Sequence, residues 1–110
     1  MRYYYNRNKY KNKRVVIDNI EFDSQREALR YLDLKVLEKA KKISDLRLQV
    51  KYELIPKQDG ERACNYVADF VYKDENGQTV VEDTKGMRTK DYIIKRKLML
   101  FRYGIKIKEI

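Results

Sequence analysis

Hydrophobic and polar residues alternate from Leu46 to Leu54, which is the period-two pattern of a strand with one buried face. Two further runs, Asn65–Tyr72 and Thr79–Gly86, are rich in β-branched or aromatic residues and predict two more strands. Between these runs lies the dipeptide Asn76-Gly77, which favours a tight turn. The middle of the chain is therefore predicted to be a sheet that includes a β-hairpin.

A short hairpin and a helix are predicted before this sheet. Residues 15–22 hold two apolar runs on either side of the turn formers Asp18-Asn19. Ser24, with Glu27 three residues later, has the spacing of a helix capping box, and the helix is expected to continue to about residue 43. The stripe expected to be buried in this helix comprises Ala28, Leu29, Leu32, Val36, Leu37 and Ala40.

A second helix is predicted from about Thr89 to Tyr103, with Gly104 at its C-cap position. Residues 104–110 are predicted to form a last strand. The order hairpin, helix, three strands, helix, strand predicts an α/β fold, in which a mixed sheet is flanked by two helices. The stripe expected to be buried in the second helix comprises Ile94, Leu98 and Phe101, broadened by Ile93 and Leu100.

Charged residues interrupt both strands of the central hairpin, at Asp69 in the first and at Asp83 and Lys85 in the second. A two-residue loop would set Asp69 opposite Thr84 and put the two aspartates on opposite faces. A three-residue loop over 75–77, with its glycine left-handed, would set Asp69 opposite Asp83. We predict the three-residue loop, because only that register gathers two carboxylates and a lysine. Glu82 is expected to face the other side of its strand.

Two carboxylates and a lysine on paired strands form a chemically specific set. Carboxylate oxygens suit a hard divalent cation such as Mg²⁺ or Mn²⁺. Such a cation polarises a phosphoryl oxygen and lowers the pKa of a bound water, while a lysine orients that water or offsets developing charge. The set formed by Asp69, Asp83 and Lys85 therefore predicts phosphodiester hydrolysis.

Composition limits the classes of function. The chain has 26 Lys and Arg residues against 17 Asp and Glu, a net charge of +9, which favours an anionic partner such as nucleic acid or a membrane surface. It has no histidine, which excludes Ser-His and Cys-His catalysis, zinc-histidine sites and nucleases with a histidine base. A single cysteine, Cys64, rules out an internal disulfide and favours a reducing cytoplasm. No apolar run reaches about 18 residues, so neither a membrane span nor a signal peptide is expected.

The segments 68–72 and 81–86, followed by Thr89, Tyr92 and Lys95, resemble the PD-(D/E)XK nuclease superfamily. More closely, they are similar to a family of small phage-encoded, Holliday-junction-resolvase-like proteins assigned to it. The resemblance covers about residues 15–110, and one departure is Ala68 in place of proline, at a position that varies in the superfamily's pattern. It implies a restriction-endonuclease-like core and a phage role in DNA recombination or processing, in the host cytoplasm.

The resemblance also implies roles for individual residues. Asp69 and Asp83 would hold the metal ion, with the Thr84 carbonyl as an extra ligand, and Lys85 would position the attacking water. Glu27 occupies the place of a glutamate on the first helix that often completes the site. A second interpretation stays open for Glu27, in which it only caps the helix, a role worth about 1 kcal/mol.

Basic residues that would contact nucleic acid fall in two regions. Residues 1–14 carry six basic side chains and no acid, and are expected to form a flexible arm before a single nuclease-like domain over 15–110. The start of the second helix offers backbone amides and lysines to phosphate. The candidate contacts are Arg2, Arg7, Lys9, Lys11, Lys13 and Arg14 in the arm and Arg88, Lys90, Lys95 and Lys97 near the helix.

The leading hypothesis is a Mg²⁺-dependent endonuclease that acts on DNA. A homodimer would supply one site for each strand of a duplex, but the sequence shows no interface. Two other classes stay open. One is a non-catalytic nucleic-acid-binding module, and the other is a basic protein-interaction module that counters a host factor. Neither alternative gives the set Asp69, Asp83 and Lys85 a task, and buried charges without one cost several kcal/mol.

Overall fold

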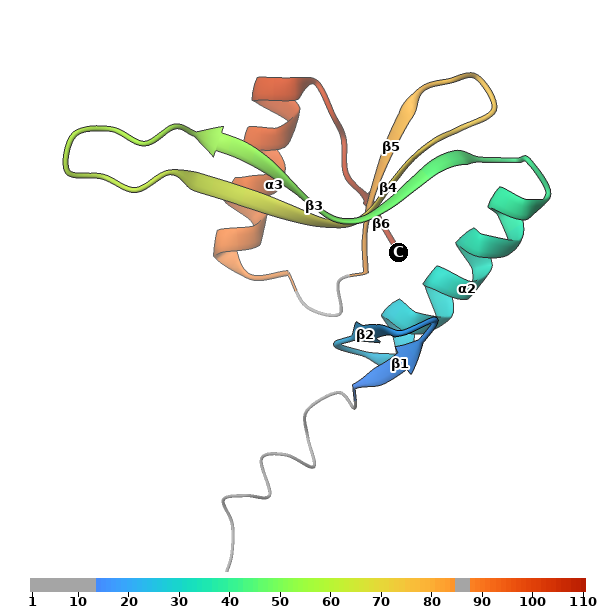
Figure 1. The fold of residues 1–110 in the computed structure, drawn as a ribbon. Helices are drawn as coiled ribbons and strands as arrows, with labels where there is room; N and C mark the ends of the chain where they lie inside the picture. Colours follow the sequence, from blue (N-terminus) through green and yellow to red (C-terminus); the bar gives the residue numbers. More distant parts are fainter. Residues whose placement is uncertain (1–13, 85–87) are drawn as a thin grey trace, which may run out of the picture. The chain divides into compact units, whose positions relative to one another are not determined.

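The computed structural model describes residues 14–84 and 88–110, and the chain divides into two compact units, residues 1–36 and 37–110. The elements follow the predicted order, and the protein has a small α/β fold with a mixed four-stranded sheet and two helices (Figure 1). Residues 1–13 of the predicted arm over 1–14 lie outside the described residues, and the single domain over 15–110 stays a prediction. The elements are β1 Val15–Ile17, β2 Ile20–Phe22, α2 Gln25–Lys39, β3 Ser44–Ile55, β4 Cys64–Lys73, β5 Thr79–Asp83, α3 Lys90–Tyr103 and β6 Lys108–Glu109.

The first unit begins with the predicted hairpin. β1 and β2 pair antiparallel around a two-residue turn, in which Asp18 and Asn19 both have positive φ, at 54° and 63°. That conformation matches the right-handed twist of the flanking strands, and Asp and Asn tolerate it. The Oδ2 atom of Asp18 also accepts a 2.8 Å hydrogen bond from the hydroxyl of Tyr31 in α2. A polar turn residue therefore fixes the hairpin to its own helix.

The helix α2 begins as predicted but differs at its end and in its buried face. Its first turn is capped by Ser24, whose Oγ accepts from the backbone N–H of Glu27 at 3.1 Å. The helix ends at Lys39, not near residue 43, because Lys41 takes a left-handed φ of 64° and Lys42 N–H bonds to the Leu37 carbonyl. This is a Schellman end without the usual glycine. The buried residues are Glu27, Ala28, Tyr31 and Leu34, whereas Leu29, Leu32 and Val36 are exposed.

In the second unit, the four-stranded sheet has the order β3-β4-β5-β6. The first three strands are antiparallel neighbours, and the short β6 runs parallel to β5. The helix α3 packs against β3 and β4, and the core lies between the sheet and this helix. The core comprises Leu54, Tyr66, Ala68, Val71, Val81, Tyr92, Met99 and Ile107.

The helix α3 has the predicted ends but a different buried face. Thr89 is its N-cap, and Gly104, with φ of 68°, ends it through a bond to the Leu100 carbonyl. Its buried residues are Tyr92 and Met99, two turns apart, whereas Phe101 is 88% exposed. The predicted stripe is therefore wrong for Ile94, Leu100 and Phe101, which are exposed, whereas Leu98 and Ile93 are partly buried against the core. The face of the helix that is buried in the core carries Tyr92 and Met99, and the hydroxyl of Tyr92 has a hydrogen-bond partner there in Glu109.

The β4–β5 hairpin has the predicted three-residue loop. Asp74 N–H bonds to the Gln78 carbonyl at 2.9 Å, and Gly77 is left-handed with φ of 78°. The ladder runs to the pair Phe70–Glu82, so the next two opposed positions are Asp69 and Asp83. The predicted three-residue loop is confirmed, and so is the predicted register as far as the pair Phe70–Glu82.

A local irregularity lies at Asp69. Val71 and Ala68 belong to one core cluster although they are three positions apart, and regular alternation would place them on opposite faces of the sheet. The change of face occurs at Gln49, which stands opposite Asp69 in the register and has a left-handed φ of 52° within β3. The alternation of side chains along β3 and β4 is therefore interrupted at Gln49 and Asp69, and Asp69 is a residue predicted to hold a metal ion.

Candidate active site

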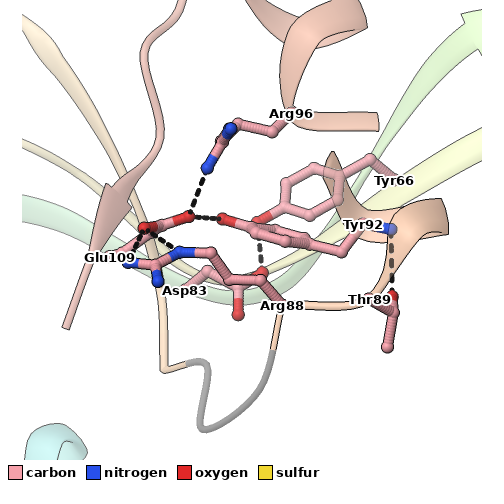
Figure 2. A network of polar contacts seen from close by, with 7 residues as sticks. All are labelled: Tyr66, Asp83, Arg88, Thr89, Tyr92, Arg96 and Glu109. Carbon is pink, nitrogen blue, oxygen red and sulfur yellow. Dashed lines mark hydrogen bonds and ion pairs between the residues drawn. The ribbon is translucent and has the colours of Figure 1, made fainter. Parts of the chain in front are cut away.

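Asp83 is held by both its side chain and its backbone. It is the last residue of β5 and only 2% exposed, and its Oδ2 accepts a 2.6 Å hydrogen bond from the Tyr66 hydroxyl (Figure 2). Its backbone carbonyl accepts from Ile110 N–H at 3.0 Å, next to the parallel pair that Asp83 forms with Glu109. The C-terminal strand thus braces the end of β5, where the acid sits.

Asp69 joins the ends of two strands. Its Oδ2 accepts from the backbone N–H of Thr84 at 2.9 Å and from the Thr84 hydroxyl at 2.8 Å. Its Oδ1 lies 3.4 Å from Nε2 of Gln49, a longer contact. Gln49 is one of the polar positions in the predicted alternation from Leu46 to Leu54, and the structure places its amide against the candidate metal ligand.

Asp69 and Asp83 both raise the pKa of one buried phenol, the side chain of Tyr66. The pKa of Tyr66 is raised well above its ordinary value, first by burial and next by the hydrogen bond to Asp83, and the charge of Asp69 adds to the shift. Tyr66 therefore remains a protonated donor at any ordinary pH, and it orients one oxygen of Asp83. Both carboxylates lie within electrostatic range of this phenol, as a shared site requires.

Glu82 is separated from this group, as the sequence predicted. It pairs with Phe70 and is fully buried, and it accepts a hydrogen bond from the Tyr72 hydroxyl. Asp83 instead bonds to Tyr66, so consecutive acidic residues of β5 have different tyrosine partners. The assignment of Asp83 as the candidate ligand rests on this separation.

A second polar cluster joins α3 to β6 (Figure 2). Glu109 Oε1 accepts from Arg88 at 2.9 Å (Nε) and 2.7 Å (Nη2), and its Oε2 accepts from the Tyr92 hydroxyl at 2.7 Å and from Arg96 at 3.3 Å. The hydrogen bond from Arg88, then that from Tyr92, lowers the pKa of Glu109 to about 2. Burial, then the bond to Glu109, raises the pKa of Tyr92. This cluster connects Arg88 and the first turns of α3 to β6.

The other predicted site residues are placed as follows. Lys85 and the arm residues Arg2, Arg7, Lys9, Lys11 and Lys13 lie outside the described residues. Glu27 belongs to the first unit, so its role beside the aspartates stays a prediction. Arg14 forms an exposed 3.6 Å ion pair with Glu21, and Arg88 is engaged by Glu109. Lys90 and Lys97 are exposed, and Lys95 is half-buried.

Oxygen donors are available for a cation. The carboxylates of Asp69 and Asp83 and the Thr84 carbonyl are the ligand types that Mg²⁺ and Mn²⁺ prefer. Each carboxylate can accept about four interactions, so one hydrogen bond to an oxygen does not exclude a metal. Within residues 14–84 and 88–110, no three acidic, cysteine or histidine side chains converge on a common point. The donor set therefore suits a hard cation, but among the described residues it contains only two acidic side chains, those of Asp69 and Asp83.

Residue patterns alone did not single out Tyr66, Glu109 or Gln49 as members of the site, and Tyr92 was named only as part of the family resemblance. The chain has ten tyrosines, so no single one stands out. Glu109 is the sole acid in a terminal segment of isoleucines and lysines, which was a usable signal. The left-handed backbone of Gln49 had no sequence signal, because glutamine does not favour it.

No helix in the described part of the chain has both the length and the apolar composition that crossing a membrane requires. No curated protein and no solved structure matches the chain significantly. One protein family does match, over residues 7–109, which is almost the whole chain. The chain belongs to this family, DUF1064, which is described as a protein of unknown function.

Proposed function

We propose that the protein is a metal-dependent endonuclease that hydrolyses phosphodiester bonds of DNA, built on a restriction-endonuclease-like core. The observation that carries the proposal is the hairpin register, which sets Asp69 opposite Asp83 at the end of paired strands. Both carboxylates act on the same buried phenol. Carboxylates at a strand end, two positions before a lysine, provide the groups that metal-assisted hydrolysis uses.

Each residue has a specific task in this proposal. Asp69, Asp83 and the Thr84 carbonyl would hold Mg²⁺ or Mn²⁺, and Glu27 would be a third or outer acid. The metal would supply Lewis acidity toward the phosphoryl oxygen and toward water. Lys85 would orient the attacking water and offset charge on the phosphate. Tyr66 would keep Asp83 in one orientation.

The net charge of +9 supports an anionic substrate. Lys90, Lys95 and Lys97 follow the candidate site on α3, and Arg88 together with the arm would add further phosphate contacts. From the resemblance, the substrate would be phage or host DNA undergoing recombination or processing. A homodimer would present one site to each strand.

The test is cleavage of paired, single-stranded and branched oligonucleotides in Mg²⁺ or Mn²⁺. Wild type is compared with Asp83→Asn and Lys85→Ala, and with Glu75→Gln as a control in the exposed loop of the same hairpin. We expect a loss of at least about 100-fold in rate for the first two variants, the scale of removing one transition-state contact. The control should cleave like wild type. Equal cleavage by all four proteins would point to a contaminating nuclease.

A second candidate is a non-catalytic nucleic-acid-binding module. It is favoured by the absence of three converging acids within the described residues, and by the hydrogen bonds that Asp69 and Asp83 already accept. In this role the aspartates would serve structure alone. DNA affinity would then be independent of divalent metal, and no oligonucleotide would be cleaved.

A further inference from the structure

A hollow of about 300 Å³ lies between β4 and the start of α3. Its lining includes Tyr66 and Tyr92, which are 4% and 5% exposed. The same two phenols bond to Asp83 and Glu109, so the hollow adjoins the candidate active site. Its lining residues are Asn65, Tyr66, Val67, Thr89, Asp91, Tyr92 and Lys95.

Three polar side chains of this lining have no partner among the described residues. The Asn65 amide, the Asp91 carboxylate and the Lys95 ammonium form no hydrogen bond or ion pair there. Asn65 and Lys95 are nevertheless half-buried, where polar groups normally find partners. A concave site with a few convergent polar groups is the usual form of a ligand pocket, and this volume is at the lower end of the range of roughly 300–1,000 Å³ for such sites.

We infer that the hollow binds one unpaired nucleotide of the DNA, next to the phosphate that is cut; this inference rests on the proposed function. Lys95 would contact a phosphate oxygen. Asn65, which both donates and accepts, and Asp91, which accepts from exocyclic amino groups, would contact the edge of the base. Val67, 46% exposed, would pack against its face.

The mixture of groups selects a nucleotide over a simple anion. A free phosphate would use Lys95 but would be repelled by Asp91 and would leave Asn65 without a partner. A nucleotide has a phosphate at one end and a base edge with donors and acceptors at the other. The size of the hollow admits one such unit, and a base that is paired within a duplex cannot enter it without leaving the stack. The substrate class is therefore DNA with an unpaired nucleotide at the site, such as a flap, a junction or a single strand.

The experiment measures binding in EDTA, so that affinity is separated from cleavage. Two labelled DNAs of the same sequence are used, one fully paired and one with unpaired nucleotides, and the ratio of their dissociation constants is the readout. We expect wild type to prefer the unpaired DNA by about tenfold, because only an unpaired base can present its edge to Asn65 within the hollow. Asn65→Leu and Lys95→Met should bring the ratio close to one.

Lys90→Met is the matched control, because Lys90 is exposed on the same helix but does not line the hollow. It should weaken binding of both DNAs alike and leave the ratio unchanged. Circular dichroism and thermal melting establish that each variant is folded. A ratio of one in wild type, or an unchanged ratio in Asn65→Leu, would overturn the inference.

Measuring both cleavage and the binding ratio in Asp83→Asn separates this inference from the proposed function. If the function is right, this variant loses cleavage but keeps the ratio. Cleavage of paired DNA by a wild type with a ratio of one defeats the inference alone. A preference for unpaired DNA without any cleavage defeats the endonuclease proposal and leaves a binding pocket for unpaired nucleotides. If wild type shows no DNA binding and no cleavage, both the inference and the proposed function are overturned.

Discussion

The hydroxyl of Tyr66 donates a 2.6 Å hydrogen bond to Oδ2 of Asp83, and both side chains are almost fully buried. The hydrogen bond restricts the Asp83 carboxylate to one orientation, and this also sets the direction in which its other oxygen, Oδ1, points. The same two strands hold a second tyrosine–carboxylate pair, Tyr72 with Glu82, which the proposed chemistry does not use. The two pairs make a matched comparison inside one protein.

Tyr66→Phe is expected to lower both stability and metal affinity. Loss of the hydroxyl leaves a buried carboxylate oxygen without this donor, at a cost of about 1–3 kcal/mol measured by urea unfolding. Tyr72→Phe should cost a similar amount. Only Tyr66→Phe should also weaken Mn²⁺ binding, by about tenfold or more, because only Tyr66 orients the candidate ligand. The measurement is Mn²⁺ titration followed by electron paramagnetic resonance.

The comparison is decisive because both variants remove one buried hydroxyl from the same strand. If the two variants lose Mn²⁺ affinity equally, the effect is one of general stability, and Tyr66 has no particular relation to the metal. If neither wild type nor the variants bind Mn²⁺, the aspartates serve structure and the binding-module alternative is favoured.

Glu109 should make the stability of the protein depend on pH in the acid range. Its pKa in the folded state is about 2, against 4.5 ordinarily, because Arg88 and Tyr92 donate to it. A lowered pKa means that the unfolded chain takes up the proton first, so the stabilisation is complete above about pH 4.5 and is lost as the pH falls toward 2. Because Arg88 is 59% exposed and screened by solvent, we expect a contribution on the order of 1 kcal/mol.

Glu109→Gln isolates this contribution from that of the other carboxylates. Urea unfolding of wild type and variant is compared at several pH values from 6 down to about 2. The variant should be less stable at pH 6, and the difference should shrink through the acid range, since glutamine carries no titratable charge. A difference in stability that stays constant with pH would mean that the Arg88–Glu109 pair does not stabilise the folded state.

The parts of the fold that could be predicted from the sequence are those set by local chemistry. Asn76-Gly77 located the hairpin turn, and the three-residue loop was chosen over the two-residue one because only its register sets Asp69 opposite Asp83. Ser24, Thr89 and Gly104 correctly marked helix ends. These signals depend on a few neighbouring residues, which is why one sequence was sufficient.

The parts that could not be predicted depend on distant residues or on rare backbone conformations. Lys41 ends α2 in a left-handed conformation that lysine does not favour, so the helix was expected to be longer. Phe101 is exposed because α3 buries the face that carries Tyr92 and Met99 in the core. Tyr66 and Asp83 are 17 residues apart, and nothing local pairs them. The candidate site was therefore predicted from its acids, and Tyr66, which orients Asp83, was missed.

Gln49 provides a test of strain beside the site. Its φ of 52° lies in a region where a non-glycine residue pays about 1–2 kcal/mol, and it faces Asp69. Gln49→Gly and Gln49→Ala both remove the amide, but only glycine relieves the backbone. We expect the glycine variant to be the more stable of the two by about 1 kcal/mol in urea unfolding. Asp69 and Asp83 are unchanged in both variants, so equal stability would show that the conformation carries no strain.

The basic arm should contribute to DNA binding through charge. Residues 2–13 carry Arg2, Arg7, Lys9, Lys11 and Lys13, and each phosphate contact adds about 0.9 to the slope of log affinity against log salt. Deletion of these residues should weaken binding and reduce that slope by up to about 4.5, which is the value for five contacts. Replacement of the five residues by glutamine in the full-length chain keeps the four tyrosines of the arm and should reduce the slope equally. Any affinity that the glutamine variant retains over the deletion then measures stacking by those tyrosines, and an unchanged slope in both proteins would remove the arm from the binding surface.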